Sequence, residues 1–291
     1  MGEFYALLTA LMWASAVIYL KWSGETIPPF ALNVFRVALS TVALLLSIVA
    51  MKQEVLREAP LRDYLTLFAS GVIAIAISDT LFLMALNRVG AGIMAIIDCL
   101  YAPFVVLFAF LLLGEELGPW QSAGMVLVIA GALIAARHEP PAGMKAKQIL
   151  IGSLYGFLSM ATVALGIVIA KPVLNRSPVL WATTMRQIGA LIVMVPVALV
   201  VPSRRKIFLL FRPARNWRYS VPGTFLGSYL ALIFWVAGMK YTSAGPAAIL
   251  NQTSSIYILI LASIFLKEPF TVRKVIASVL AIVGIVMVTL G

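Results

Sequence analysis

The stretch Tyr5–Arg36, YALLTALMWASAVIYLKWSGETIPPFALNVFR, has an echo 150 positions later at Tyr155–Arg186, YGFLSMATVALGIVIAKPVLNRSPVLWATTMR. The shift aligns Lys21 with Lys171. Each copy reads as an apolar helix that ends near this lysine, a turn with proline, and a second apolar helix with an arginine near its start. Such an echo predicts a chain built from two copies of one helical unit.

The composition assigns these helices to a lipid bilayer. Hydrophobic residues make up 62% and charged residues 11% of the 291 positions, with a mean hydropathy of +1.04, far from the balance of soluble domains. A span of about 20 apolar residues crosses the hydrocarbon, and barrel strands would alternate instead. We predict an all-α polytopic membrane protein with ten transmembrane helices, at about 3–22, 31–51, 64–86, 91–113, 119–137, 150–171, 179–201, 218–240, 244–266 and 272–290.

The echo continues along the chain at a shift of 153, which brings Asp98 onto Asn251. We therefore predict two five-helix repeats, in residues 1–140 and 148–291. Because five is odd, the second copy enters the membrane from the opposite side, and inverted repeats of this kind are typical of transporters that alternate access around a site near the midplane.

Short motifs recur at matching places in the two halves. They are Leu113-Gly114-Glu115 after the fourth helix, Leu266-Lys267-Glu268-Pro269 after the ninth, and Gly131 and Gly284 in the closing helices. With the helix count and the repeat, they resemble the EamA-type branch of the drug/metabolite transporter (DMT) superfamily. The resemblance implies a ten-helix carrier in a prokaryotic inner (plasma) membrane, commonly an exporter of amino acids or other small metabolites.

The net charge of +11 has a topological explanation. The basic residues lie mostly in loops and at helix ends, which argues against a nucleic-acid partner. Their excess in odd-numbered loops predicts cytoplasmic odd loops and outside termini, whereas the family commonly has both termini inside. The orientation stays open.

Enzyme motifs are absent from the sequence. The single histidine, His138, has no second histidine for a metal site, and there is no P-loop or nucleophile elbow. We expect no catalytic residue, metal or cofactor, and an ion or solute gradient as the energy source.

Four charges fall inside predicted spans, where they are costly and suggest function: Arg36, Asp79, Asp98 and Arg186. At 1.5 Å per residue, Asp79 and Asp98 lie about 12 Å below one membrane face and Arg36 about 9 Å below it. We predict one cluster of these three that handles a proton or cation, since two close carboxylates with one cation tend to share a proton. A purely structural ion pair is the alternative.

Arg186 has no acidic partner in the second half, apart from Glu268 in a loop. A buried guanidinium of this kind suits a substrate carboxylate or phosphate, although snorkelling or backbone contacts would also satisfy it. Other candidate substrate-binding residues are polar or aromatic groups well inside their spans, for which packing is the alternative: Asn251, Gln252, Trp13, Tyr101 and Trp235.

Two matched pairs of charges stand at helix ends, namely Lys21 with Lys171 and Glu115 with Glu268. We interpret them as snorkelling anchors and turn formers, with a gating ion pair left open.

These patterns predict a secondary active transporter in the bilayer, a monomer or homodimer, that exports an amino acid or related zwitterionic small molecule, with protons as an optional coupling ion. A multidrug antiporter of lipophilic cations is the second choice. A structural, regulatory or lipid-handling membrane protein is the alternative of another class. Substrate identity and direction are not readable.

Overall fold

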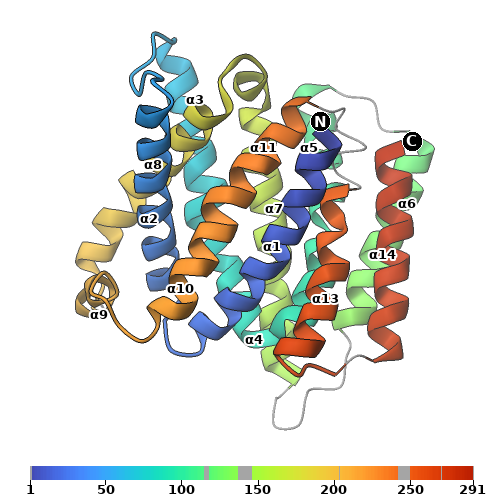
Figure 1. Cartoon of the computed structure of the whole chain (residues 1–291). Helices are drawn as coiled ribbons and strands as arrows, with labels where there is room; N and C mark the ends of the chain where they lie inside the picture. The colour runs from blue at the N-terminus through green and yellow to red at the C-terminus, as the bar shows by residue number, and fades with distance from the viewer. Residues whose placement is uncertain are drawn as a thin grey trace.

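The computed structural model describes residues 2–114, 118–136, 146–202, 204–241, 250–269 and 271–290, and these residues contain helices and turns but no strand (Figure 1). The first half contains α1 (Gly2–Gly24), α2 (Pro29–Ala50), α3 (Leu61–Gly71), η1 (Val72–Ile77), α4 (Ser78–Asp98), α5 (Tyr101–Leu113) and α6 (Pro119–Ala136). The second half contains α7 (Ala146–Arg176), α8 (Val179–Val200), α9 (Arg204–Leu209), α10 (Trp217–Thr224), η2 (Phe225–Ala231), α11 (Leu232–Tyr241), α13 (Ser254–Phe265) and α14 (Val272–Leu290).

Six helices in the described ranges are long and apolar enough to cross a membrane, and shorter apolar helices accompany them. The all-helical, multi-pass membrane class is therefore confirmed, while ten spans in two inverted repeats remain a prediction. The basic loop before α10 adds the short helix α9, which the sequence did not predict. Glu115, His138 and the predicted span start at 244 lie outside the described residues.

The two helices that follow the lysine turns begin in the same way. Pro28 precedes α2 with φ −58° and ψ 142°, and Pro178 precedes α8 with φ −61° and ψ 139°. Proline fixes φ and lacks the N–H that the first turn of a helix leaves unused, so it defines the helix start in both copies.

Two π-helices interrupt the helices that run past the centre of the bundle. The shift of 153 that relates Asp98 to Asn251 also brings η1 onto η2. A π-helix leaves the regular hydrogen-bond ladder and is frequent at functional sites. In η1 the carbonyls of Ile75 and Ala76 accept hydrogen bonds from Asn33 Nδ2 of α2, at 2.9 and 3.4 Å.

The chain turns back sharply inside α4. Gly90 has φ 80° and ψ 170°, a conformation that favours glycine. In a straight helix Asp79 and Asp98 would be about 28 Å apart, yet both line one cavity. The single residue Gly90 thus joins the predicted third and fourth spans.

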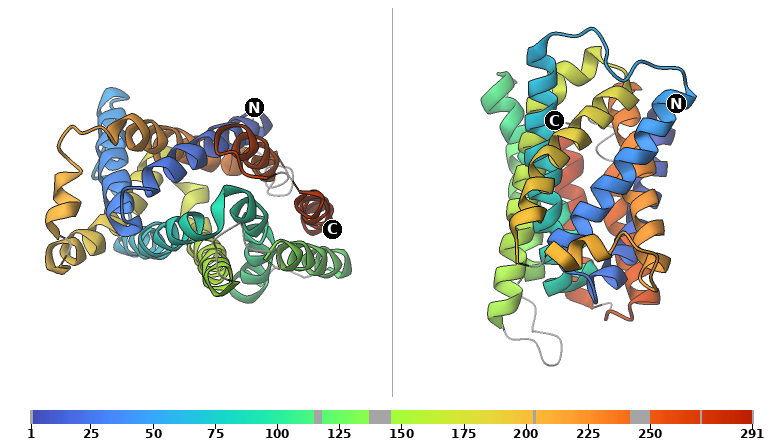
Figure 2. Two further views of the ribbon diagram at one scale, coloured as in Figure 1. Left: turned by 90° about the horizontal axis from the view of Figure 1, so that it is seen from below. Right: turned by 90° about the vertical axis from the view of Figure 1, so that its left-hand side faces the viewer.

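The helices pack so that the halves interleave. Helix α3 packs on α8, α4 on α7, and α1 on both α11 and α13, while α6 and α14 form a pair at one edge (Figure 2). In this edge pair Gly131 faces the Ala277 carbonyl and Gly284 faces the Gly124 carbonyl, so any side chain would collide. Gly2 and Leu290 lie at the same end of the bundle (Figure 1).

Candidate functional site

A cavity of about 150 Å³ lies between the two halves. Its walls come from α1, α2, η1, α4, α5, α7, α8, η2 and α11, together with residues 251–254. All nine residues predicted from the sequence line it: Trp13, Arg36, Asp79, Asp98, Tyr101, Arg186, Trp235, Asn251 and Gln252. Their roles remain predictions.

Arg36 is 1% exposed and forms a loose ion pair with Asp79, with 3.7 Å between Nη2 and Oδ2. Its Nε donates to Ser228 Oγ in η2 at 3.1 Å, and its Nη1 has no hydrogen-bond partner among the described residues. The Asp79 side chain is 26% exposed, which leaves its carboxylate accessible from the cavity.

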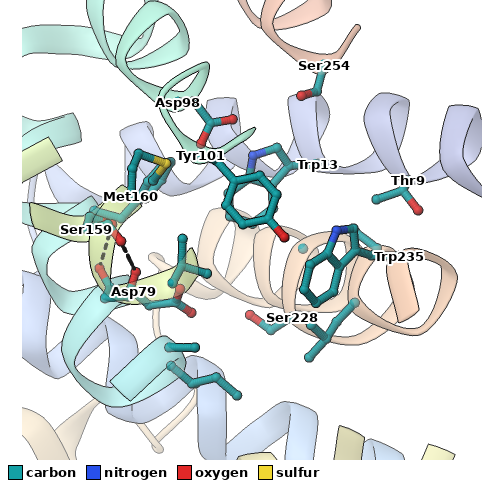
Figure 3. Close-up of a pocket in the computed structure, with 18 of the residues that line it drawn as sticks. Thr9, Trp13, Asp79, Asp98, Tyr101, Ser159, Met160, Ser228, Trp235 and Ser254 are labelled. Carbon is teal, nitrogen blue, oxygen red and sulfur yellow. Dashed lines mark hydrogen bonds between the residues drawn. The ribbon is translucent and has the colours of Figure 1, made fainter. Parts of the chain in front are cut away.

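The predicted cluster of three charges is reduced to a pair. Arg36 pairs with Asp79, and the described ranges contain no ion pair for Asp98. Asp98 is the last residue of α4, shortly before α5 begins at Tyr101. Its carboxylate lies on the opposite side of the cavity from Ser228 (Figure 3). Equal depth in the membrane did not imply contact, because the hairpin helices place the two carboxylates on different walls.

Arg186 is 2% exposed and is held by contacts other than an ion pair in the described structure. Its Nε donates to Ser70 Oγ of α3 at 3.0 Å, its guanidinium carbon lies 5.9 Å from the Trp235 ring centroid, and its Nη1 has no hydrogen-bond partner there. The second half supplies no acid for Arg186, but Asp79 of the first half lines the same cavity, which the sequence did not reveal.

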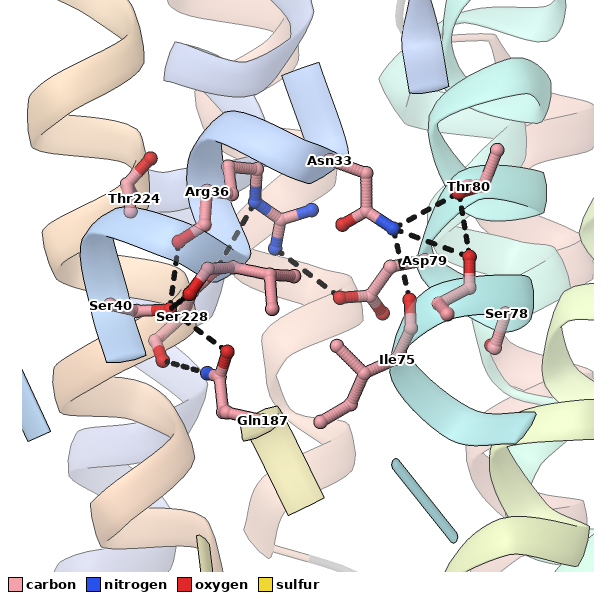
Figure 4. A network of polar contacts seen from close by, with 12 residues as sticks. Asn33, Arg36, Ser40, Ile75, Ser78, Asp79, Thr80, Gln187, Thr224 and Ser228 are labelled. Atoms are coloured by element: carbon pink, nitrogen blue, oxygen red, sulfur yellow. Dashed lines mark hydrogen bonds and ion pairs between the residues drawn. The ribbon is translucent and has the colours of Figure 1, made fainter. Parts of the chain in front are cut away.

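Each arginine therefore reaches a serine of the other half. Gln187 extends this connection, because its Oε1 accepts from Ser40 Oγ at 3.1 Å and its Nε2 donates to the Ser228 carbonyl at 3.1 Å (Figure 4). A buried network in which most groups are satisfied fixes the relative position of the elements that supply it. The two halves are joined at the depth of the cavity.

Two further residues that line the cavity each carry a buried polar atom without a hydrogen-bond partner in the described part of the chain, the hydroxyl of Tyr101 and Oε1 of Gln252. Tyr101 projects between Trp13 and Trp235 (Figure 3), and its ring centroid lies 6.3 Å from that of Trp235. The cavity thus combines aromatic walls with hydrogen-bonding groups that are held in place but unused.

Polar contacts join the helices around the turn at Gly90, at the end of the bundle opposite Gly2 and Leu290. Glu268 accepts hydrogen bonds from the backbone N–H groups of Ala91 at 2.7 Å and Gly92 at 2.8 Å, and lies 3.5 Å from Lys274 Nζ. The carboxylate therefore caps the positive N-terminus of the helical segment that leads to Asp98.

Lys21 binds the helical segment that precedes the same turn. Its Nζ donates to the carbonyls of Leu86 at 3.0 Å and Asn87 at 3.3 Å, and Asn87 Nδ2 donates to the Gly24 carbonyl at 3.1 Å. Lys21 and Glu268 both bind the backbone of this hairpin, which agrees with their interpretation as turn formers. The snorkelling role and the gating ion pair remain predictions. Glu268 pairs with Lys274, and Glu115 lies outside the described residues.

Sequence reasoning missed several polar residues of the site. Ser70 and Ser228 hold the arginines, Gln187 joins the halves, and Thr9 and Ser159 line the cavity. Gln187 could have been found, since it follows Arg186 directly inside an apolar span. The serines could not, because serine is common in membrane helices as a helix contact. The described residues contain no group of three or more potential metal ligands of the His, Cys, Asp or Glu type.

Long apolar helices around an internal polar cavity define a polytopic membrane protein with room for a small solute. The model of the EamA-like transporter family matches residues 1–137 and 150–290, so the chain belongs to this family and is a membrane transporter by class. It is 25% identical to an uncharacterized transporter of Archaeoglobus fulgidus over 98% of this chain and 96% of the relative. A solved protein crystal structure shares the fold with a TM-score of 0.69 at 17% identity, covering 99% of this chain and 96% of that one.

Proposed function

We propose that the chain is a secondary active transporter of a small zwitterionic metabolite, with an amino acid or a related compound as the first choice and export as the direction. The observation that carries this proposal is a set of residues that line one cavity and each carry a buried polar atom without a hydrogen-bond partner in the described structure: Arg36 at Nη1, Arg186 at Nη1, Tyr101 at its hydroxyl and Gln252 at Oε1. Buried polar groups without a partner each cost about 1–3 kcal/mol. A transported solute would relieve that cost while it is bound.

The chemistry of these groups favours a solute with two opposite ends. Arg186 offers a free N–H to a carboxylate, with the Tyr101 hydroxyl as a second donor. Asp98 and Gln252 Oε1 offer acceptors to an ammonium group. Trp13 and Trp235 provide aromatic surface between the two ends.

The size of the cavity supports a small solute. A volume of about 150 Å³ corresponds to roughly five waters at about 30 Å³ each, which suits a molecule with the dimensions of an amino acid. The second candidate, a lipophilic cation exchanged for protons, is favoured by the aromatic walls. It would require a wider cavity and would leave both buried arginines without a role in binding.

The contacts around Gly90 support an alternating-access cycle. Lys21 and Glu268 bind the hairpin there. In this proposal these contacts close one end of the bundle, and ten spans in two inverted five-helix repeats would allow the opposite end to close in the same way. In this proposal the transporter is a monomer or homodimer in the plasma membrane of a prokaryote.

Asp79 and Asp98 are the proposed coupling groups. Asp79 faces Arg36 across a long ion pair, and Asp98 has no ion pair in the described structure. A carboxylate that is neutralised by a proton in one state and by a solute amine in another would link proton movement to transport. The structural alternative, in which polar groups pair off completely, predicts no unpartnered atoms in the cavity.

The test is a thermal-shift screen of purified protein against amino acids, sugar phosphates and lipophilic cations, because a ligand that binds the folded state raises its apparent stability. We expect a shift with a zwitterion and a loss of that shift in Arg186→Gln. Stabilisation by lipophilic cations alone, unchanged in Arg186→Gln, would replace the first proposal by the second. No stabilisation by any of the three classes, combined with no transport in proteoliposomes, would refute both.

A further inference from the structure

A second and larger cavity, of about 740 Å³, lies towards the end of the bundle that carries Gly2 and Leu290. Its lining residues come from the end of α2, residues 51–57, the turn from α7 to α8, the start of α8, η2 and α11, together with Tyr5 of α1. Its volume is within the range of cavities that hold organic ligands of drug size.

Helix α11 separates this cavity from the transport site. Leu232 and Trp235 face the transport cavity, whereas Ile233, Phe234 and Ala237 face the second one. Among the described residues, none lines both cavities. A ligand in the second cavity would therefore lie outside the transport cavity.

Cationic groups surround the mouth of the cavity. Arg57, Arg176 and Lys240 line it, and none of the described residues in its lining is acidic. Arg176 is already neutralised, since Nε and Nη2 bind the two carboxylate oxygens of Asp63. Lys240 Nζ makes one hydrogen bond, to the Ser177 carbonyl at 3.1 Å, and no hydrogen bond or ion pair engages the Arg57 guanidinium among the described residues. Two cations thus remain available for an anion.

The deeper part of the cavity is apolar and aromatic. Leu180, Ile233 and Ala237 line it together with Phe234, whose ring stacks on Tyr5 with 5.8 Å between centroids. The floor is the hydrogen bond between Ser47 and Tyr229, with 2.5 Å between the hydroxyl oxygens. These groups satisfy each other, so the interior offers apolar contact and little demand for a polar ligand.

We propose that this cavity binds an acidic phospholipid, with the phosphate headgroup between Arg57 and Lys240 and an acyl chain along Ile233, Phe234 and Ala237. The cavity has cationic side chains at the ends of membrane spans and apolar side chains further into the membrane. This arrangement matches an acidic lipid in a leaflet, with its headgroup at the surface and its acyl chains below. A soluble phosphate would use the mouth and leave the apolar interior empty. The bound lipid would fill the space between α2 and α8 on one side and α11 on the other.

The experiment uses the full chain, purified in an uncharged detergent and depleted of lipid. Phosphatidylglycerol is titrated while bound lipid is counted by native mass spectrometry and the apparent melting temperature is followed, with phosphatidylcholine and inorganic phosphate in parallel. We expect one tight phosphatidylglycerol per chain with a rise in melting temperature, weaker binding of phosphatidylcholine, and no response to phosphate. An equal response to inorganic phosphate, or no preference over phosphatidylcholine, would overturn the proposal.

Variants locate the site. Each basic group near a headgroup contributes about 1 kcal/mol, so the exposed double variant Arg57→Gln/Lys240→Gln should weaken phosphatidylglycerol binding roughly 30-fold. The matched control is Arg204→Gln/Arg205→Gln, which removes two exposed charges from α9. Ala237→Phe, which fills the apolar part, should lower the affinity without a change in charge. Equal binding by the first double variant and its control would refute the assignment.

Discussion

The substitution Glu268→Gln tests whether one carboxylate holds the hairpin around Gly90. In the wild type, both oxygens accept hydrogen bonds from the backbone, at Ala91 and Gly92, and Lys274 is the ionic partner. Glutamine keeps one acceptor oxygen. One buried N–H then loses its partner, and Lys274, with a side chain 7% exposed, loses its counter-charge.

The expected cost follows from these contacts. A charge-assisted hydrogen bond is worth about 1.5–3 kcal/mol against about 1 kcal/mol for a neutral one, and an unsatisfied buried N–H costs about 1–3 kcal/mol. Together they destabilise the turn by about 2–4 kcal/mol. At 1.4 kcal/mol per factor of ten, the turn should open about 30- to 1,000-fold more often.

Hydrogen–deuterium exchange with mass spectrometry reads this opening directly, because backbone amides exchange from the open state. Peptides that cover residues 86–98 should exchange faster by that factor, while peptides from α8 should not change. Glu58→Gln is the matched control, since Glu58 is an exposed acid in the loop before α3. Exchange of residues 86–98 within twofold of the wild type would refute the role of Glu268, and a uniform increase over all peptides would indicate general destabilisation instead.

Four other substitutions, with one control, address the cavity and its support. Arg186→Gln should weaken a carboxylate ligand by about 10- to 150-fold in calorimetry, as one charge-assisted hydrogen bond is lost; unchanged affinity would mean that the ligand binds elsewhere. Asp79→Asn and Asp98→Asn, made singly, should alter the pH dependence of transport in proteoliposomes, and a profile that survives both would remove them as coupling groups. Gly71→Ala should lower the free energy of unfolding by about 1–3 kcal/mol, because the new Cβ would collide with the Arg186 carbonyl. The control is Gly238→Ala, whose Cβ would lie 3.4 Å from its nearest neighbour. This control should be close to neutral in the same denaturation assay.

The arginines show how far a sequence can locate a site. The two arginines were chosen because they occupy equivalent positions in the repeat, and the aspartates because they lie at a similar depth. All of these residues line one cavity. The partners of the arginines could not be predicted, because they depend on which helices pack against each other. Arg36 forms an ion pair with Asp79 and not with Asp98, and Arg186 donates a hydrogen bond to Ser70 of the other half. Depth follows from the rise per residue, but direction around a helix depends on packing.

The sequence alone determined the membrane class, the proline-defined starts of α2 and α8 and the position of the buried charges, since these depend on local composition, on proline geometry and on the cost of charge in lipid. The tertiary structure decided the rest. It showed that Tyr5–Arg36 and Tyr155–Arg186 are joined through Ser40, Gln187 and Ser228, and that Glu268 closes the hairpin at Gly90 from 177 residues away. Such contacts arise between segments that are remote in the chain, and no local pattern in either segment specifies its partner.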